Sequence, residues 1–140
     1  MDDPREELEQ MIELINRYRE QGNQISMQLN ILNASLNEHM IARETIQNYG
    51  SLQQGDETLI PVGGNSYIRA SASENKKVLI GIGADYVLEK GADECIAMIS
   101  SRIENMQKGR DRMAENLSTL EARVKELTDR AETLARTIEG

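Results

Sequence analysis

Residues 96–138 read IAMISSRIENMQKGRDRMAENLSTLEARVKELTDRAETLARTI, and an apolar side chain recurs along them at alternating steps of three and four. A repeat of about 3.5 residues, kept over several heptads, is typical of a helix that pairs with another helix in a coiled coil. Twelve of the 13 positions in this stripe are apolar, so we predict a long coiled-coil helix. The positions are Ile96, Ile99, Ile103, Met106, Arg110, Met113, Leu117, Leu120, Val124, Leu127, Ala131, Leu134 and Ile138.

A second stripe of the same kind lies near the other end of the chain, and nine of its 12 positions are apolar. We therefore expect one helix over about residues 5–48 and another over about 92–138, roughly 66 and 69 Å long at the α-helical rise. Similar lengths predict antiparallel pairing as a helical hairpin. The first stripe comprises Leu8, Met11, Ile15, Tyr18, Gly22, Ile25, Leu29, Leu32, Leu36, His39, Arg43 and Ile46.

The segment between the stripes has the pattern of four short strands, at 58–62, 66–72, 76–82 and 86–89. Turn residues separate them at 63–65, 73–75 and 83–85, which predicts two β-hairpins. We thus predict an α+β, mainly α fold, in which two β-hairpins are inserted between the helices of a long antiparallel two-helix coiled coil. Its segments are 1–49, 50–91 and 92–140, all in one structural domain.

Isolated hairpins are marginally stable, and their open edges favour pairing with other strands. We therefore interpret residues 50–91 as an assembly module. Its candidate assembly residues are Leu59, Ile60, Val62, Tyr67, Ile68, Val78, Leu79, Ile80, Ile82 and Val87.

The composition limits the possible functions. The chain has no Trp, no Phe and a net charge of −8, and it divides into −5, −1 and −2 over residues 1–49, 50–91 and 92–140. Binding to nucleic acid or to an anionic membrane needs clustered Lys and Arg, so we expect neither. Two long helices enclose little interior, which favours oligomerisation. With no signal-peptide pattern and no spanning apolar run, we expect a cytoplasmic protein.

We call the two stripes, where the helices would pair, the seam of the coiled coil. At one end of the predicted coiled coil, positions beside the seam are apolar as well. Near the start of the first helix the flanking positions are also apolar, and one partner helix cannot cover so wide a stripe. Such patches commonly mark interaction sites, although a wider bundle would also bury them. Met27, Ile31, Ile41 and Met98 also fall off the seam, as scattered surface residues often do. The candidate tip residues are Leu8, Met11, Ile12, Leu14, Ile15, Leu134 and Ile138.

The sequence contains no recognisable catalytic, cofactor-binding or metal-binding motif. Residues 81–86, GIGADY, have Tyr86 in place of the third glycine of a dinucleotide fingerprint, and no phosphate-binding loop is present. The single His39 and single Cys95 make no metal site, and Cys95 fits a packing role better than a reactive one. We therefore expect no cofactor and no enzymatic activity.

The middle segment resembles the alpha class of prefoldin subunits, in residues 59–67, LIPVGGNSY, and 78–90, VLIGIGADYVLEK. The resemblance extends over the whole chain through the order of heptad helix, two hairpins and heptad helix. It implies a chaperone hexamer in which two alpha subunits join four beta subunits through a β-barrel body. Coiled-coil tips would hold unfolded proteins and pass them, without ATP, to a cytosolic group II chaperonin.

Two other functions remain open from the residues alone. A structural coiled-coil scaffold or spacer would need no free apolar patch and no client. An arm of a nucleic-acid enzyme is the third possibility, and the acidic helices argue against it.

Overall fold

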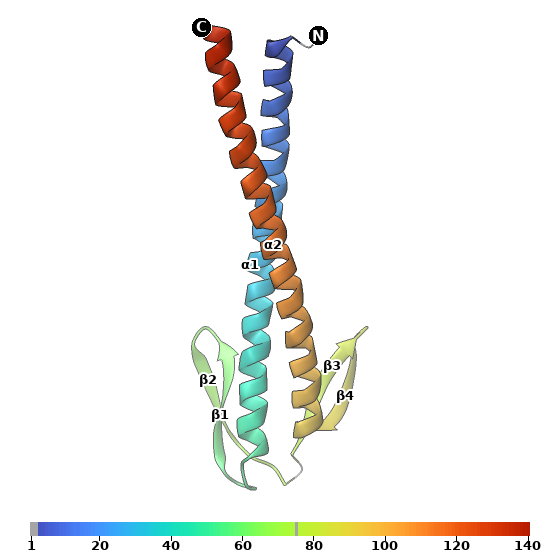
Figure 1. Cartoon of the computed structure of the whole chain (residues 1–140). Helices are drawn as coiled ribbons and strands as arrows, with labels where there is room; N and C mark the ends of the chain where they lie inside the picture. The colour runs from blue at the N-terminus through green and yellow to red at the C-terminus, as the bar shows by residue number, and fades with distance from the viewer. Residues whose placement is uncertain (1–2, 75) are drawn as a thin grey trace. The chain divides into compact units, whose positions relative to one another are not determined.

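The computed structural model describes residues 3–74 and 76–140, so Asn75 of the predicted turn lies outside the described part. Along the chain, two antiparallel β-hairpins come between two long helices, which confirms the predicted fold class (Figure 1). The elements are α1 (Pro4–Gly50), β1 (Glu57–Gly63), β2 (Ser66–Ser71), β3 (Lys77–Gly83), β4 (Tyr86–Gly91) and α2 (Ala92–Glu139).

The start of each helix follows from local chemistry. Asp3 caps α1 by accepting a hydrogen bond from the backbone N–H of Arg5 at 3.0 Å, and Pro4 occupies the first helical position. Acidic side chains lie in the first turn of both helices, and Arg136 lies in the last turn of α2. These charges oppose the partial charges of the helix ends.

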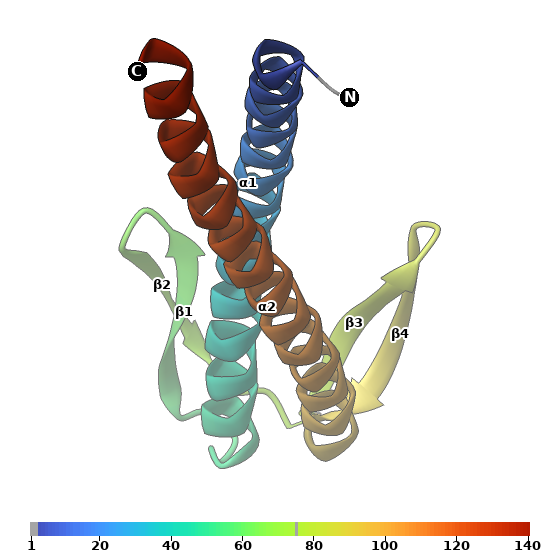
Figure 2. The same cartoon turned by 45° about the horizontal axis from the view of Figure 1, so that its top comes forward.

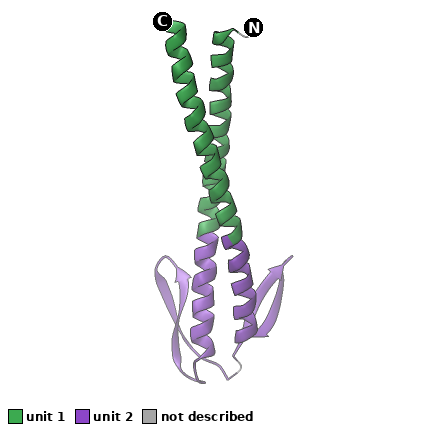
Figure 3. Ribbon diagram, viewed as in Figure 1, with its two compact units in different colours: residues 1–33, 108–140 green, residues 34–107 purple. Residues whose placement is uncertain are grey.

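The chain divides into two compact units, and each combines parts of both helices (Figure 3). The terminal unit contains residues up to 33 together with 108–140. The hairpin unit contains residues 34–107 and therefore holds both β-hairpins.

In the terminal unit α1 and α2 run antiparallel, and the two chain ends lie at the same end of the unit (Figure 1). Its buried core consists of Ile15, Leu127 and Ala131. Every predicted seam position in this unit is buried or half-buried. The half-buried residues packed against the core are Leu8, Met11, Leu14, Tyr18 and Val124.

In the hairpin unit the core includes a strand as well as the two helices. Ile80 of β3 packs with Leu36 of α1 and with the first turns of α2. Strand β3 thereby draws Cys95 and Met98 into the packing, two residues that lie off the predicted seam. The buried residues are Leu36, Ile80, Cys95, Ile99 and Ile103, and Ala42, Ile46, Val78, Met98 and Met106 pack against them.

The polar residues that interrupt the α1 seam in this unit have partners. Arg43 donates from Nη1 to Ser100 Oγ of α2 at 3.3 Å. His39 Nδ1 lies 2.7 Å from the carbonyl oxygen of Ser35, one helical turn earlier. Because these partly buried polar groups are hydrogen-bonded, the seam tolerates them at little cost in stability.

Gly22 is the seam position of α1 in the terminal unit that has no side chain to pack against α2. A Cβ added there would lie 3.5 Å from Leu117 Cδ1, which is ordinary van der Waals contact. A groove of about 280 Å³ lies beside it, lined in part by Tyr18 and Leu120. We predict that Gly22→Ala raises the free energy of unfolding by about 1 kcal/mol, because alanine favours the helix by that amount.

Thermal or urea unfolding of the isolated chain measures this gain. Gly50→Ala is the control, since its Cβ would come within 3.1 Å of Ala92 Cβ and should give no comparable gain. A Gly22→Ala variant no more stable than the wild type would contradict the packing described for this position.

The thiol of Cys95 is fully buried, with an exposed fraction of 0%. Its Sγ lies 3.9 Å from the carbonyl oxygens of Val78 and Lys90. Burial raises the pKa of this thiol, Glu94 adds to the rise, and Lys90 opposes it. We predict that folded protein at neutral pH resists alkylation by iodoacetamide, because little thiolate forms and the sulfur is covered.

Mass spectrometry of the alkylated chain, with and without denaturant, checks this prediction. Rapid modification of the folded chain at a rate close to that of the denatured chain would show that the hairpin unit opens readily.

Candidate functional site

The two hairpins have the same design, repeated after 20 residues. The register runs from Glu57↔Ser71 to Gly63↔Ser66 in the first hairpin and from Lys77↔Gly91 to Gly83↔Tyr86 in the second, each with a bulge before the turn. Both turns hold left-handed residues, including the non-glycine Ala84 at φ 51°. Two positive-φ residues in a two-residue loop are typical of the type I′ turn that suits a twisted hairpin.

The hairpins differ in how they attach to the helices. In the second hairpin, Ile80 is buried and Val78 half-buried in the core of the unit, and Arg102 of α2 donates to the carbonyl oxygen of Gly81 at 2.6 Å. In the first hairpin the equivalent residue, Ile60, is 41% exposed. The second hairpin is therefore anchored to the helices by a buried side chain, whereas Ile60 and Pro61 of the first hairpin lie beside Ile46 of α1 with Ile60 only partly covered.

The first hairpin instead borders an open groove beside α1. The groove has a volume of about 730 Å³. Ile41, Thr45 and Asn48 line it from α1, and Leu59 and Tyr67 line it from the hairpin. Figure 2 shows the first hairpin beside α1 and the second beside α2. A polar contact of 3.2 Å joins Tyr49 Oη to Ser73 Oγ near the base of the first hairpin.

Eight of the ten candidate assembly residues have exposed side chains, and two, Val78 and Ile80, pack inward. Sequence reasoning missed Tyr86 and Leu88, which are 70% and 38% exposed and belong to the predicted last strand. The 20-residue repeat was a signal that could have directed attention to this strand. The exposed candidates are Leu59, Ile60, Val62, Tyr67, Ile68, Leu79, Ile82 and Val87.

The terminal unit carries the predicted tip residues. Leu8, Met11, Leu14 and Ile15 come together in one cluster, and Ile15 is its buried member at 6% exposure. Ile12 projects away from this cluster and is 47% exposed. The tip is therefore narrower than the sequence suggests, because Leu14 and Ile15 contribute mainly to the coiled-coil packing.

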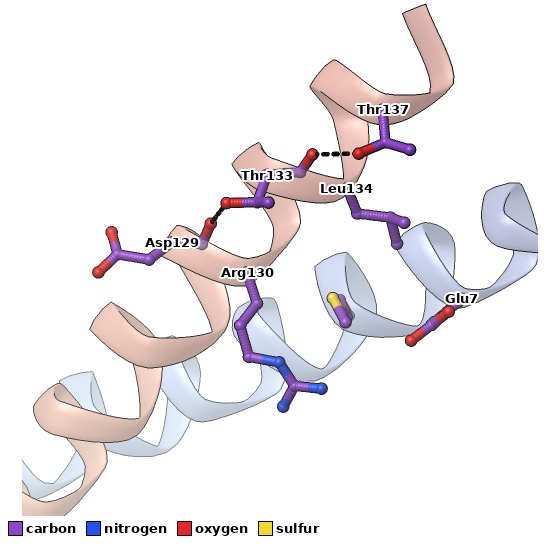
Figure 4. A pocket seen from close by; sticks show the side chains of 7 residues that line it. Glu7, Asp129, Arg130, Thr133, Leu134 and Thr137 are labelled. Carbon is purple, nitrogen blue, oxygen red and sulfur yellow. Dashed lines mark hydrogen bonds between the residues drawn. The ribbon is translucent and has the colours of Figure 1, made fainter. Parts of the chain in front are cut away.

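Two grooves lie at this end of the terminal unit. The first, of about 390 Å³, has Met11 and Leu134 as its apolar lining and Glu7, Asp129 and Arg130 among its polar residues (Figure 4). Thr133 and Thr137 also line it, and their hydroxyls donate to backbone carbonyls four residues earlier in α2. This groove combines apolar walls with charged side chains.

The second groove, of about 310 Å³, has Leu8, Ile12, Ile15, Ala131 and Ala135 as its apolar lining, with Arg19 and Glu132 among its polar residues. The predicted tip residue Ile138 is half-buried and lines neither groove. We use the name tip surface for the apolar linings of both grooves, namely Leu8, Met11, Ile12, Ile15, Ala131, Leu134 and Ala135.

The described residues contain no group of three or more His, Cys, Asp or Glu side chains placed to hold a metal ion. Among the same residues, neither helix has an apolar stretch long enough to cross a bilayer. The surfaces described above offer exposed apolar side chains that can bind other apolar side chains.

The fold and its surfaces define a class of protein: paired long helices that carry two β-hairpins between them, with apolar side chains open to solvent on the hairpins and at the free helix ends. A sequence profile described as prefoldin subunit matches residues 18–137. The chain belongs to the prefoldin subunit family.

Similar proteins include several archaeal subunits named prefoldin subunit alpha. The one from Methanopyrus kandleri is 30% identical over 112 residues, covering 80% of this chain and 71% of that protein. The one from Methanospirillum hungatei is 29% identical over 136 residues, covering 96% and 89%. The one from Methanocorpusculum labreanum is 27% identical over 115 residues, covering 82% and 78%.

The fold is also similar to a solved structure, described as the cryo-EM structure of filamentous PFD from Methanocaldococcus jannaschii. The TM-score is 0.66 at 19% identity, and the match covers 84% of this chain and 98% of that one. Family membership identifies the chain as a chaperone subunit that assembles with other prefoldin subunits.

Proposed function

We propose that this chain is a subunit of an ATP-independent chaperone that holds unfolded polypeptides at its tip surface and delivers them to a group II chaperonin. The observation that carries the proposal is the pair of grooves near the chain ends, whose apolar lining includes Ile12 at 47% exposure and the half-buried side chains of Leu8, Met11, Leu134 and Ala135. The family resemblance implies two kinds of partner, unfolded client proteins and a group II chaperonin.

The size of the tip surface suits weak and reversible binding. The grooves offer only two and five apolar side chains, and most of these are partly buried, so one tip alone should bind an unfolded segment weakly. A complex with several tips gains affinity because one client chain can contact more than one tip at once. Weak single contacts also let the client leave without an energy source such as ATP.

We further propose that the exposed hairpin residues join this chain to beta-type subunits. The complex would contain two alpha subunits and four beta subunits. Large apolar side chains on a hairpin are costly to leave in water, and burying one in an interface contributes roughly 1.5–3 kcal/mol. The anchored second hairpin presents Leu79, Val87 and Tyr86 at 71%, 58% and 70% exposure, and all three are available to a neighbouring subunit.

The tip proposal predicts that Ile12→Gln, combined with Met11→Gln, weakens the suppression of client aggregation by the assembled complex about tenfold, through lost apolar burial. Light scattering of a chemically denatured client diluted into the complex measures the effect. Glu9→Gln is the matched control, an exposed change on the same helix that lines neither groove.

Thermal unfolding of the same variants separates binding from folding. Ile12 is 47% exposed, so the single variant Ile12→Gln should leave stability nearly unchanged. Met11 packs against the core and its replacement should cost some stability, whereas Ile15→Ala should destabilise the chain by about 2–5 kcal/mol. Full suppression by the double variant would favour a structural scaffold over a client-binding tip.

The assembly proposal predicts that Leu79→Ser weakens association with a beta-type subunit by about tenfold or more. Glu89→Ser is the control, because Glu89 pairs directly with Leu79 across the hairpin and is also exposed. Native mass spectrometry across a concentration series measures the complex. An unchanged complex with Leu79→Ser would remove this face of the hairpin from the interface.

A further inference from the structure

A stretch of α1 carries no charge, although charged residues make up 29% of the chain. From Gln21 to Asn37 there are 17 residues without Asp, Glu, Lys or Arg, and seven of them are Asn or Gln. Most of this stretch lies in the terminal unit, where the segment of α2 from residue 108 onward is highly charged. The lack of charge is therefore a property of α1 alone.

Within this stretch, four exposed residues follow the spacing of one helix face: Gln24, Met27, Gln28 and Ile31. We name them the Met27 stripe. Met27 is 65% and Ile31 71% exposed, the two most exposed large apolar side chains of α1. The seam residues Ile25, Leu29 and Leu32 are half-buried on another side of the helix. The stripe is therefore not part of the pairing with α2.

The Met27 stripe is too short to pair with another coiled coil. A second seam needs a repeat kept over three or four heptads. This stripe spans little more than one heptad. The next positions along the same face are the polar Glu20 and Gln21 on one side and the small Ala34 and Ser35 on the other, so no large apolar side chain continues it. Two large side chains also fall well short of the roughly 800 Å² per partner that a stable protein interface buries. A permanent neighbour is a poor fit, and a transient one fits better.

We propose that the Met27 stripe is a second contact site for unfolded polypeptide, which binds there as an extended segment with apolar side chains. The inference rests on the proposed holding function and extends it from the tip surface to the middle of α1. An extended chain exposes one N–H donor and one C=O acceptor at every residue. The amides of Gln24 and Gln28 can both donate and accept, so they can satisfy backbone groups that binding removes from water.

The apolar pair supplies the affinity, and its chemistry suits varied clients. Methionine is flexible and polarisable, so it adapts to side chains of different shape. The absence of charge on this face means that neither acidic nor basic clients are repelled. Met27 lies about 22 Å along the helix from Ile12, a distance that about seven extended residues span. One client segment is therefore long enough to contact both sites.

The test uses the assembled complex, with the double variant Met27→Gln and Ile31→Gln. Both changes keep a good helix former and remove only apolar surface. We expect client aggregation suppression to weaken about five- to tenfold, with thermal unfolding and complex mass unchanged. In a second arm, a benzophenone amino acid replaces Met27 and is irradiated with a denatured client. The control probe replaces Glu115, an exposed residue of α2 in the same unit.

Cross-linking of the client from position 27 but not from position 115, together with the loss of suppression, supports the inference. Cross-linking from position 27 to another subunit of the complex overturns it, because that subunit then covers the stripe. Full suppression by the stripe variant, when the tip variant has lost it, overturns this inference and leaves the proposed function intact. If neither variant affects suppression, both proposals fail.

Discussion

The narrowness of the α1–α2 seam is the constraint on which the rest of the structure depends. Each helix buries one stripe against the other, and in the terminal unit the buried core of the described residues consists of Ile15, Leu127 and Ala131. Two helices cannot enclose more than this, so every apolar side chain outside the stripe remains in water unless a third element covers it. In the hairpin unit β3 is that element, and it covers Cys95 and Ile99. In the terminal unit none of the described elements has this role.

This constraint divides the apolar residues of the chain by their role. Seam residues stabilise the helix pair, and the Met27 stripe lies outside the seam. The tip surface combines both roles, because Leu8, Met11, Ile15, Ala131 and Leu134 are seam positions, whereas Ile12 and Ala135 lie outside the seam. The hairpins show the same division within one strand, because Ile80 packs inward while its neighbour Leu79 is 71% exposed. A β-strand sends successive side chains to opposite faces, so one strand can serve the fold with one face and another subunit with the other.

The sequence was sufficient to predict the two helices, the two hairpins and the seam, because each depends on a local repeat or a turn motif. It was less informative about burial. Periodicity placed Leu14 and Ile15 in the tip patch with Ile12, yet only Ile12 projects away from the packing. A packing role was expected for Cys95, but Met98 was placed among scattered surface residues. Met98 is half-buried because it packs in a core that includes Ile80 of β3, which is distant in sequence. Contacts of this kind follow from tertiary packing, which the period of a single helix does not encode.

The full burial of Cys95 has a practical consequence for work on the assembled complex. The chain has a single cysteine, and its sulfur is covered by the core of the hairpin unit. A cysteine introduced at an exposed position would then be the sole thiol accessible to a spin label or a fluorophore in the folded subunit. Pairs of such labels on the hairpins and the helix ends would report distances during client capture, with the native core left unaltered.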